Sequence, residues 1–147
     1  MSRSVAGYLI DASWRKRGRN LRYGISSYVL SPDFKTDVGF VRRTDQRRTN
    51  GNISYRWWPE TWLISWGSSA RYGRSYTFDG VLEDEDRQIG VDFLFTNNVA
   101  FNTEVSRDKE RFGGIDFDKT RYRFFGIMST SRLVGFAVSY NFGDQIF

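Results

Sequence analysis

Apolar and polar residues alternate along almost the whole chain, and a helical period is hard to find. Within residues 50–58, for example, Ile53 and Tyr55 share one side and polar residues stand between them. Such a period of two indicates β-strands with one apolar face. Eight segments alternate clearly, and a ninth is ambiguous because Phe125 and Ile127 fall on its arginine side. The clear segments are residues 6–15, 21–26, 37–40, 50–58, 62–71, 88–95, 99–106 and 134–142, and the ninth is 121–129. The sequence therefore predicts an all-β fold of about nine antiparallel strands.

The two sides of these strands differ in a way that favours a membrane. The apolar side carries essentially no charge at mid-strand, and the polar side is rich in glycine and small polar residues. An Arg or Lys that points into lipid at the bilayer midplane costs about 2–4 kcal/mol, so a lipid-facing row is expected to lack charge. A solvent-exposed sheet face would carry more Lys, Glu and Thr than this chain offers. In the wide lumen of a transmembrane barrel, charged substitutions at Gly67 and Ser69 are expected to be tolerated.

The predicted connections alternate in length. Short turns at 31–33, 59–60, 96–98 and 129–131 separate longer, charged segments at 15–20, 42–49, 71–88 and 106–121. Tight periplasmic turns and larger outer loops are typical of an up-and-down transmembrane β-barrel. Aromatic residues flank these ends, as in the girdles of such barrels. They are Trp57, Trp58, Trp62, Phe93, Phe95 and Phe101 at the short turns, and Trp14, Tyr72, Tyr76, Tyr140 and Phe142 at the other end.

The strand number bears on completeness. Bacterial single-chain barrels have an even number of strands, whereas about nine are predicted here. The last residues, 144–147, read as a loop that is cut off, and no secretory signal opens the sequence. We therefore expect residues 1–147 to be a single barrel domain or a segment of a larger barrel.

The amino-acid composition excludes several kinds of functional site. Cysteine and histidine are both absent, which excludes disulfides, thiolate or imidazole metal sites and a Ser-His-Asp triad. No run of 18 apolar residues exists, so a transmembrane helix is not expected. Aromatic residues make up 18% of a chain whose mean hydropathy is −0.54. A net charge of +5 would suit nucleic acid or an anionic membrane, but the arginines are dispersed rather than gathered in one patch.

One stretch carries a resemblance to a known family. Its residues are Ser31-Pro32-Asp33-Phe34, Val38-Gly39-Phe40-Val41, Arg43 and Tyr55-Arg56-Trp57-Trp58-Pro59. They resemble large bacterial outer-membrane proteins that join an N-terminal module, similar to family-9 carbohydrate-binding domains, to a C-terminal barrel domain of unknown function. The resemblance implies a barrel fold and an outer-membrane location. It transfers no catalytic residue, and carbohydrate would be a partner only through the module that this sequence lacks.

Two kinds of acidic site are conceivable from the sequence. Glu83-Asp84-Glu85-Asp86, and Asp116 with Asp118, could hold calcium but read better as solvated loops without metal. Asp92 and Glu104 could lie on one face of neighbouring strands, and two carboxyls about 5–9 Å apart could serve glycoside hydrolysis. Pairing with arginines in an interior charge ladder is favoured instead. The predicted lumen-lining residues are Arg22, Arg56, Arg71, Asp92 and Glu104, which would either favour anionic solutes or brace a narrow lumen.

The sequence predicts a bilayer-embedded barrel segment with a role in passive passage, uptake or anchoring. No catalytic residue, metal, cofactor or nucleic-acid partner is expected. The alternative is a soluble β-barrel or β-sandwich that binds carbohydrate or another small ligand, with the aromatic side as its core. A third hypothesis, a basic barrel that stacks single-stranded nucleic acid on exposed aromatics, predicts salt-sensitive binding.

Overall fold

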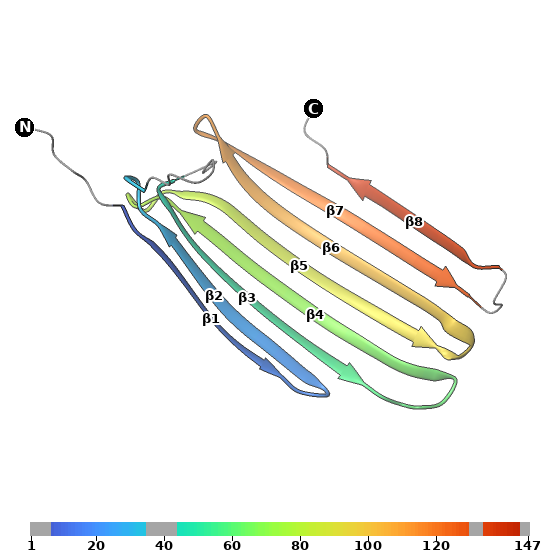
Figure 1. The fold of residues 1–147 in the computed structure, drawn as a ribbon. Helices are drawn as coiled ribbons and strands as arrows, with labels where there is room; N and C mark the ends of the chain where they lie inside the picture. The colour runs from blue at the N-terminus through green and yellow to red at the C-terminus, as the bar shows by residue number, and fades with distance from the viewer. Residues whose placement is uncertain (1–6, 35–43, 130–133, 145–147) are drawn as a thin grey trace, which may run out of the picture.

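Eight strands form one sheet in which every strand pairs with its neighbours in sequence and runs antiparallel to them (Figure 1). This computed structural model describes residues 7–34, 44–129 and 134–144. The strands are β1 (Leu9–Arg17), β2 (Leu21–Leu30), β3 (Gln46–Trp57), β4 (Leu63–Tyr76), β5 (Leu82–Phe95), β6 (Val99–Phe112), β7 (Ile115–Met128) and β8 (Phe136–Gly143), with a short 3₁₀ turn η1 (Thr96–Asn98) before β6. The predicted all-β, antiparallel, up-and-down fold is confirmed.

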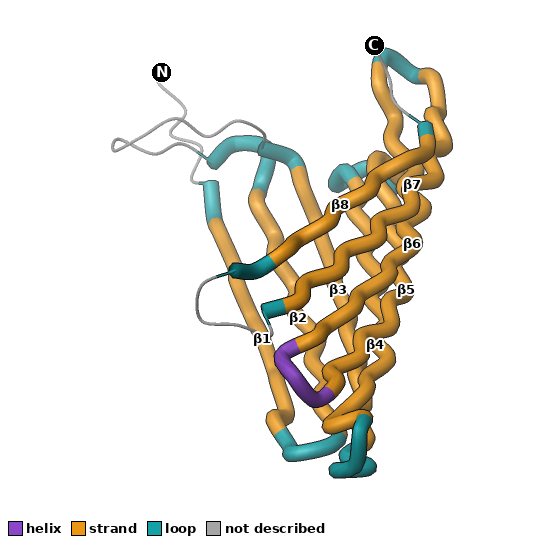
Figure 2. The backbone as a smooth tube through the Cα atoms, turned by 90° about the vertical axis from the view of Figure 1, so that its right-hand side faces the viewer, coloured by secondary structure: helices purple, strands orange, loops and turns teal. Residues whose placement is uncertain are grey.

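The sheet is curved into an arch that does not close (Figure 2). Strands β1 and β8 form its two edges and do not pair with each other. The prediction of a closed barrel is therefore not met by the described strands, which number eight rather than nine. The predicted segment at 37–40 lies outside the described residues. The ambiguous segment at 121–129 belongs to β7, where Phe125 and Ile127 do share a side with the arginines.

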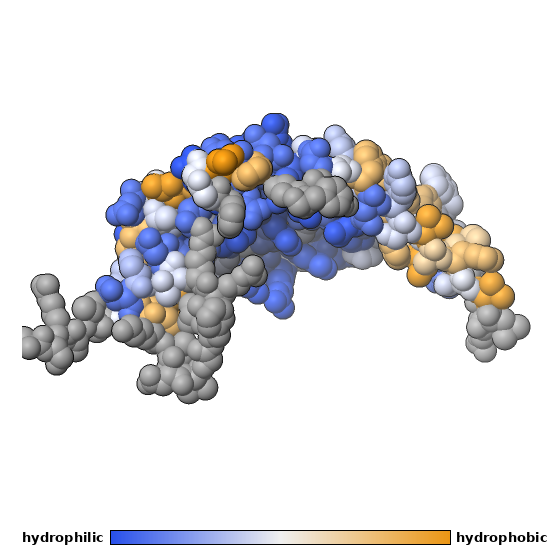
Figure 3. Space-filling model, turned by 90° about the horizontal axis from the view of Figure 1, so that it is seen from above, coloured by the Kyte–Doolittle hydropathy of each residue, from blue (hydrophilic) through white to orange (hydrophobic). Residues whose placement is uncertain are grey.

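Pairing registers carry the alternation in phase from strand to strand, apart from register shifts at the two ends of the β4–β5 pairing, between Leu63 and Ser65 and between Ser75 and Tyr76. Trp57 lies opposite Trp66, Trp66 opposite Phe93, and Phe93 opposite Phe101. Because side chains on paired residues point to the same side of a sheet, the apolar sides of all eight strands merge into one apolar face. The intervening residues merge into a polar face. Hydrophilic residues fill the hollow of the arch (Figure 3).

The connections lie at two ends of the sheet. The Pro59 end carries the connections at 18–20, 58–62 and 96–98, and the Gly113 end carries those at 77–81 and 113–114. The predicted alternation of short and long loops is wrong. Segments 71–88 and 106–121 are mostly strand, and each turns within five residues or fewer. Both faces of these strand ends are charged, so no alternation of apolar and polar residues identifies them as strand.

Two tight turns explain how the long strands reverse. Gly113 and Gly114 both have positive φ, 59° and 83°, as a two-residue type I′ hairpin turn requires. Gly80, with φ of 83°, ends a turn in which the Thr77 Oγ1 accepts a hydrogen bond from the Val81 amide. At the Pro59 end Asn97 and Asn98 adopt positive φ, which asparagine tolerates better than most residues.

The sheet has almost no core of its own. Leu30 is the single buried apolar side chain of the described residues. Several buried residues on the polar face are instead small, such as Ser65, Ser75 and Gly67. A fold with one layer leaves its apolar side to be covered by something outside that layer.

Candidate functional site

The apolar face is largely uncovered. Val138 is 69% exposed, Ile89 65% and Phe136 61%. Tyr55, at 38%, is likewise not enclosed in an interior. Isolated exposed apolar residues are normal, but a continuous apolar surface marks a site that contacts another apolar phase or partner. This face is therefore the first candidate surface.

Aromatic rings form a ladder across this face near the Pro59 end. Trp57 stacks on Trp66 with ring centroids 3.9 Å apart and planes within 8°. The ladder continues through Phe93 and Phe95, whose ring is 5.7 Å from that of Trp62. Trp57, Trp62, Phe93 and Phe95 belong to one of the predicted aromatic girdles, and the structure adds Trp66 to them. Trp58 differs, since it follows the polar phase and lies near the guanidinium groups of Arg19 and Arg56.

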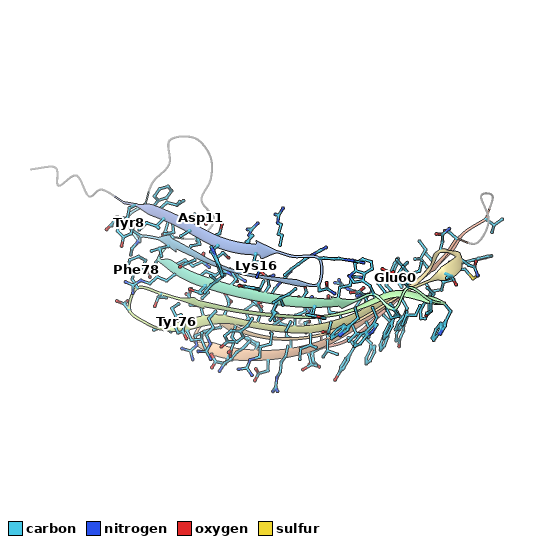
Figure 4. All side chains as sticks on the ribbon, turned by 90° about the horizontal axis from the view of Figure 1, so that it is seen from below. Tyr8, Asp11, Lys16, Glu60, Tyr76 and Phe78 are labelled. Atoms are coloured by element: carbon cyan, nitrogen blue, oxygen red, sulfur yellow. The ribbon has the colours of Figure 1, made fainter. Side chains whose placement is uncertain are left out.

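Other aromatic residues lie at the Gly113 end. Tyr8, Tyr76 and Phe78 are found there, at the opposite end of the sheet from Glu60 (Figure 4). Tyr8 and Phe78 make an edge-to-face contact at 6.3 Å, and the Arg47 guanidinium lies 4.0 Å from the Phe78 ring. Rings with a polar neighbour suit the boundary between an apolar and an aqueous phase.

The apolar band shifts along the strands at one edge of the sheet, on β1 and β2. Lys16 of β1 and Phe142 of β8 lie in one row, which passes through Ile89. On β8 the apolar residues run from this row toward the Pro59 end, whereas on β1 they run from Trp14 back to Tyr8 on its other side. From β3 to β8 the apolar residues keep to the same rows, so the shift of the band along the strands is confined to β1 and β2.

Ion pairs organise the polar face. Arg56 donates to Asp92 at 2.7 Å and to the Ser65 hydroxyl at 3.0 Å. Arg123 pairs with Glu104 at 3.7 Å. Further pairs on this face are Arg48 with Asp86 at 2.8 Å, Lys119 with Glu110 at 2.6 Å, and Arg121 with Asp108. Neutralised in pairs, these cations do not make a uniformly basic strip of the kind that nucleic acid requires.

The five predicted lumen-lining residues all lie on the polar face by their register: Arg22, Arg56, Arg71, Asp92 and Glu104. The ladder prediction is right for Arg56 with Asp92. The partner of Glu104 is Arg123, which the sequence did not single out, although Arg123 shares the phase of Arg121. Neither Arg22 nor Arg71 forms an ion pair within the described part of the chain.

A groove of about 740 Å³ follows the polar face across β4 to β8. Cations and carboxylates both line it, among them Arg71, Arg121, Arg123, Glu104 and Asp108. Mixed charge of this kind favours a hydrated surface rather than selection of one ion sign.

The space beside the Cα atom of Gly67 is smaller than a glycine at this position suggests. A Cβ at this position would come within 2.9 Å of Asp92 Oδ1 and 3.3 Å of Arg56 Nη2. The Arg56–Asp92 pair fills the space that the missing side chain leaves. A side chain at Gly67 would therefore have to displace the ends of the Asp92 and Arg56 side chains, whereas Ser69 is exposed, and the tolerance of charge at both positions stays a prediction.

The acidic run Glu83–Asp86 is not a loop but the start of β5. Its side chains alternate between the faces, so the run does not gather around one point. Glu85 lies on the apolar face, four residues beyond Ile89, and accepts hydrogen bonds from Tyr72, Arg74 and Arg87. The hydrogen bond from Tyr72 and those from the two arginines lower the pKa of Glu85 to about 2.

Asp116 and Asp118 likewise belong to a strand, β7. Hydrogen bonds from Arg111 and Lys109 lower the pKa of Asp116 to about 2. Within residues 7–34, 44–129 and 134–144, no three acidic side chains gather where they could share a metal ion.

Comparison of the chain with protein-family models, with curated proteins and with solved structures finds no match in any of the three. The resemblance to the barrel domain of large outer-membrane proteins thus stays a prediction. In the described part of the chain, no helix has the length and apolarity to cross a membrane.

Proposed function

We propose that this chain forms part of the wall of a bacterial outer-membrane β-barrel, with its apolar face in lipid and its polar face toward the interior. The observation that carries the proposal is the exposed, uncharged, continuous apolar band on a single sheet that buries one apolar side chain among its described residues. The role that follows is passive passage or anchoring, without catalysis.

The ion-paired polar face also supports the proposal. Asp92 and Glu104, the carboxylates that could be considered for acid–base work, are both held by arginines. Paired charges that brace neighbouring strands suit an interior wall, where an unpaired charge is costly.

Lipid also sets a requirement on the two edges. Unpaired N–H and C=O groups of an edge strand are not tolerated in the hydrocarbon region. The proposal therefore requires that β1 and β8 pair, either with each other or with additional strands.

Adjacent tryptophans that point to opposite faces provide the test. Two variants retain either Trp57 or Trp58 as the one tryptophan, the other four being replaced by phenylalanine, and both are reconstituted in vesicles whose acyl chains carry bromine. Trp57 is expected to lose most of its fluorescence to bromine, and Trp58 much less, because only Trp57 would contact acyl chains. Equal quenching of both, or a monodisperse folded chain without detergent, would contradict the proposal and favour the soluble binding module.

A further inference from the structure

A group of five side chains on the apolar face lies just past the band, toward the Gly113 end. It comprises Tyr72, Arg74, Glu85, Arg87 and Arg107, contributed by β4, β5 and β6. We refer to it as the arginine cluster. Along the same strands the next residues toward the Pro59 end on this face are apolar: Ala70, Ile89 and Val105.

Glu85 fixes the positions of two of the arginines. Its Oε1 accepts a hydrogen bond from the Tyr72 hydroxyl at 2.6 Å, from Arg74 Nε at 3.1 Å and from Arg87 Nη2 at 2.9 Å. The Glu85 side chain is 10% exposed, whereas those of Arg74 and Arg87 are 44% and 57% exposed. Each guanidinium has five N–H donors, so both present further donors outward from a fixed position.

Arg107, the third arginine of the cluster, lies next to Arg87. Arg87 and Arg107 are directly opposite each other in the pairing of β5 with β6, and both line a groove of about 240 Å³ together with Glu85, Lys109 and Asp118. Like charges at directly opposite positions destabilise a sheet. No carboxylate among the described residues pairs with Arg107, so an anion from outside the chain would relieve the repulsion.

An apolar hollow adjoins the cluster through Tyr72. Its volume is about 380 Å³, and its lining includes Trp14, Ile25, Ile53 and Tyr72 around Gly51. A Cβ added to Gly51 would meet no atom within 4 Å. The floor of the hollow is therefore open because this strand position lacks a side chain.

We propose that the arginine cluster and this hollow together bind one phosphate-bearing lipid of the membrane. Its phosphate lies on Arg74, Arg87 and Arg107, and one acyl chain lies over Gly51. Arginine suits phosphate oxygens because its donors form a planar fork, and basic residues at a membrane boundary attract anionic headgroups. The inference rests on the proposed function, since it requires this face to be in contact with lipid.

Titration calorimetry of the full chain in a nonionic detergent tests the site with two probes, dihexanoyl phosphatidic acid and inorganic phosphate. The wild type is expected to bind the lipid more tightly than inorganic phosphate. Arg87→Gln combined with Arg107→Gln is expected to weaken lipid binding about tenfold to thirtyfold, given the contribution of each arginine near a membrane surface. Gly51→Leu, which fills the hollow, is expected to weaken lipid binding and leave phosphate binding unchanged.

The matched control is Arg15→Gln combined with Arg17→Gln, which removes the same charge from the polar face of β1. Its lipid binding should equal that of the wild type. Wild-type affinity in the Arg87/Arg107 variant, or an equal loss in the control, would overturn the arginine cluster as the site. Equal affinity for both probes together with no effect of Gly51→Leu would overturn a lipid as the ligand.

The Trp57 and Trp58 quenching experiment separates the two levels of the proposal. If Trp57 contacts brominated acyl chains and the calorimetric expectations fail, the lipid site alone is wrong. If Trp57 shows no contact with acyl chains, the proposed function fails and the lipid site fails with it.

Discussion

Glu85 links the local chemistry of the apolar face to the stability of the sheet. Three donors converge on one of its carboxylate oxygens, and they lower its pKa to about 2 from an ordinary value of 4.5. A carboxyl that binds its proton less tightly in the folded chain than in the unfolded chain stabilises the fold where it is ionised. Because Glu85 lies outside the apolar band, water can reach its carboxylate, and its protonation state follows the pH of the solution.

The expected consequence is a pH-dependent loss of stability. The contribution of Glu85 is complete above about pH 4.5 and is lost as the pH falls toward about 2, because the unfolded chain then takes up the proton first. Denaturant unfolding in detergent at pH 6 and at pH 3 measures it. Glu85→Gln should reduce the difference between the two pH values. Glu60→Gln, whose pair with Arg19 is exposed, should not, and equal behaviour of the two variants would refute the assignment.

Individual pairings on the polar face were only partly predictable. Arg56 with Asp92 follows from strand phase and opposite charge, and the structure contains this pair. Glu104 was expected to meet Arg22, Arg56 or Arg71, yet it meets Arg123. Alternation tells which residues share a face, but the register between strands decides which of them are neighbours.

Strands β4 to β7 each contain 14 residues, more than the about 9–11 that a tilted transmembrane strand needs. Their apolar residues occupy about half of that length, and the remainder is charged on both faces. In the proposed setting the charged halves stand outside the hydrocarbon layer. Because charged residues occupy both faces of these halves, no alternation of apolar and polar residues marks them as strands, and the sequence pattern predicts loops there.

The Gly113–Gly114 turn should control the formation of the β6–β7 hairpin. Gly113→Val places a β-branched residue at φ of 59°, and the strained backbone should destabilise the folded chain by about 1–2 kcal/mol. Gly113→Asn should be nearly neutral, because Asn-Gly is favoured in type I′ turns. Urea unfolding in detergent measures both, and equal stability of the two variants would refute this turn geometry.

At the scale of the whole molecule, one curved layer presents two surfaces of opposite character. The apolar surface is uncovered, and the polar surface is bound together by ion pairs. A soluble domain covers such an apolar surface with another layer. None of the described strands supplies it, which is why a bilayer is the proposed neighbour.

Neighbouring residues on β8 offer a test at this scale. Val138 and Ser139 are both exposed but lie on opposite faces. Val138→Arg should destabilise the chain in lipid by about 2–4 kcal/mol, because it places a charge in the hydrocarbon layer. Ser139→Arg should cost far less. Folding equilibria in vesicles measure the difference, and similar costs would argue that water borders both faces.

The sequence by itself determined the all-β class, the antiparallel order and the face that each alternating residue occupies. These follow from the period of two, which is a local property of the backbone. The tertiary structure alone decided the register, the open edges, the extension of four strands through their charged halves, and the meeting of Arg87 with Arg107. Each of these depends on pairing between segments distant in sequence, and no local pattern encodes which row of one strand will face which row of the next.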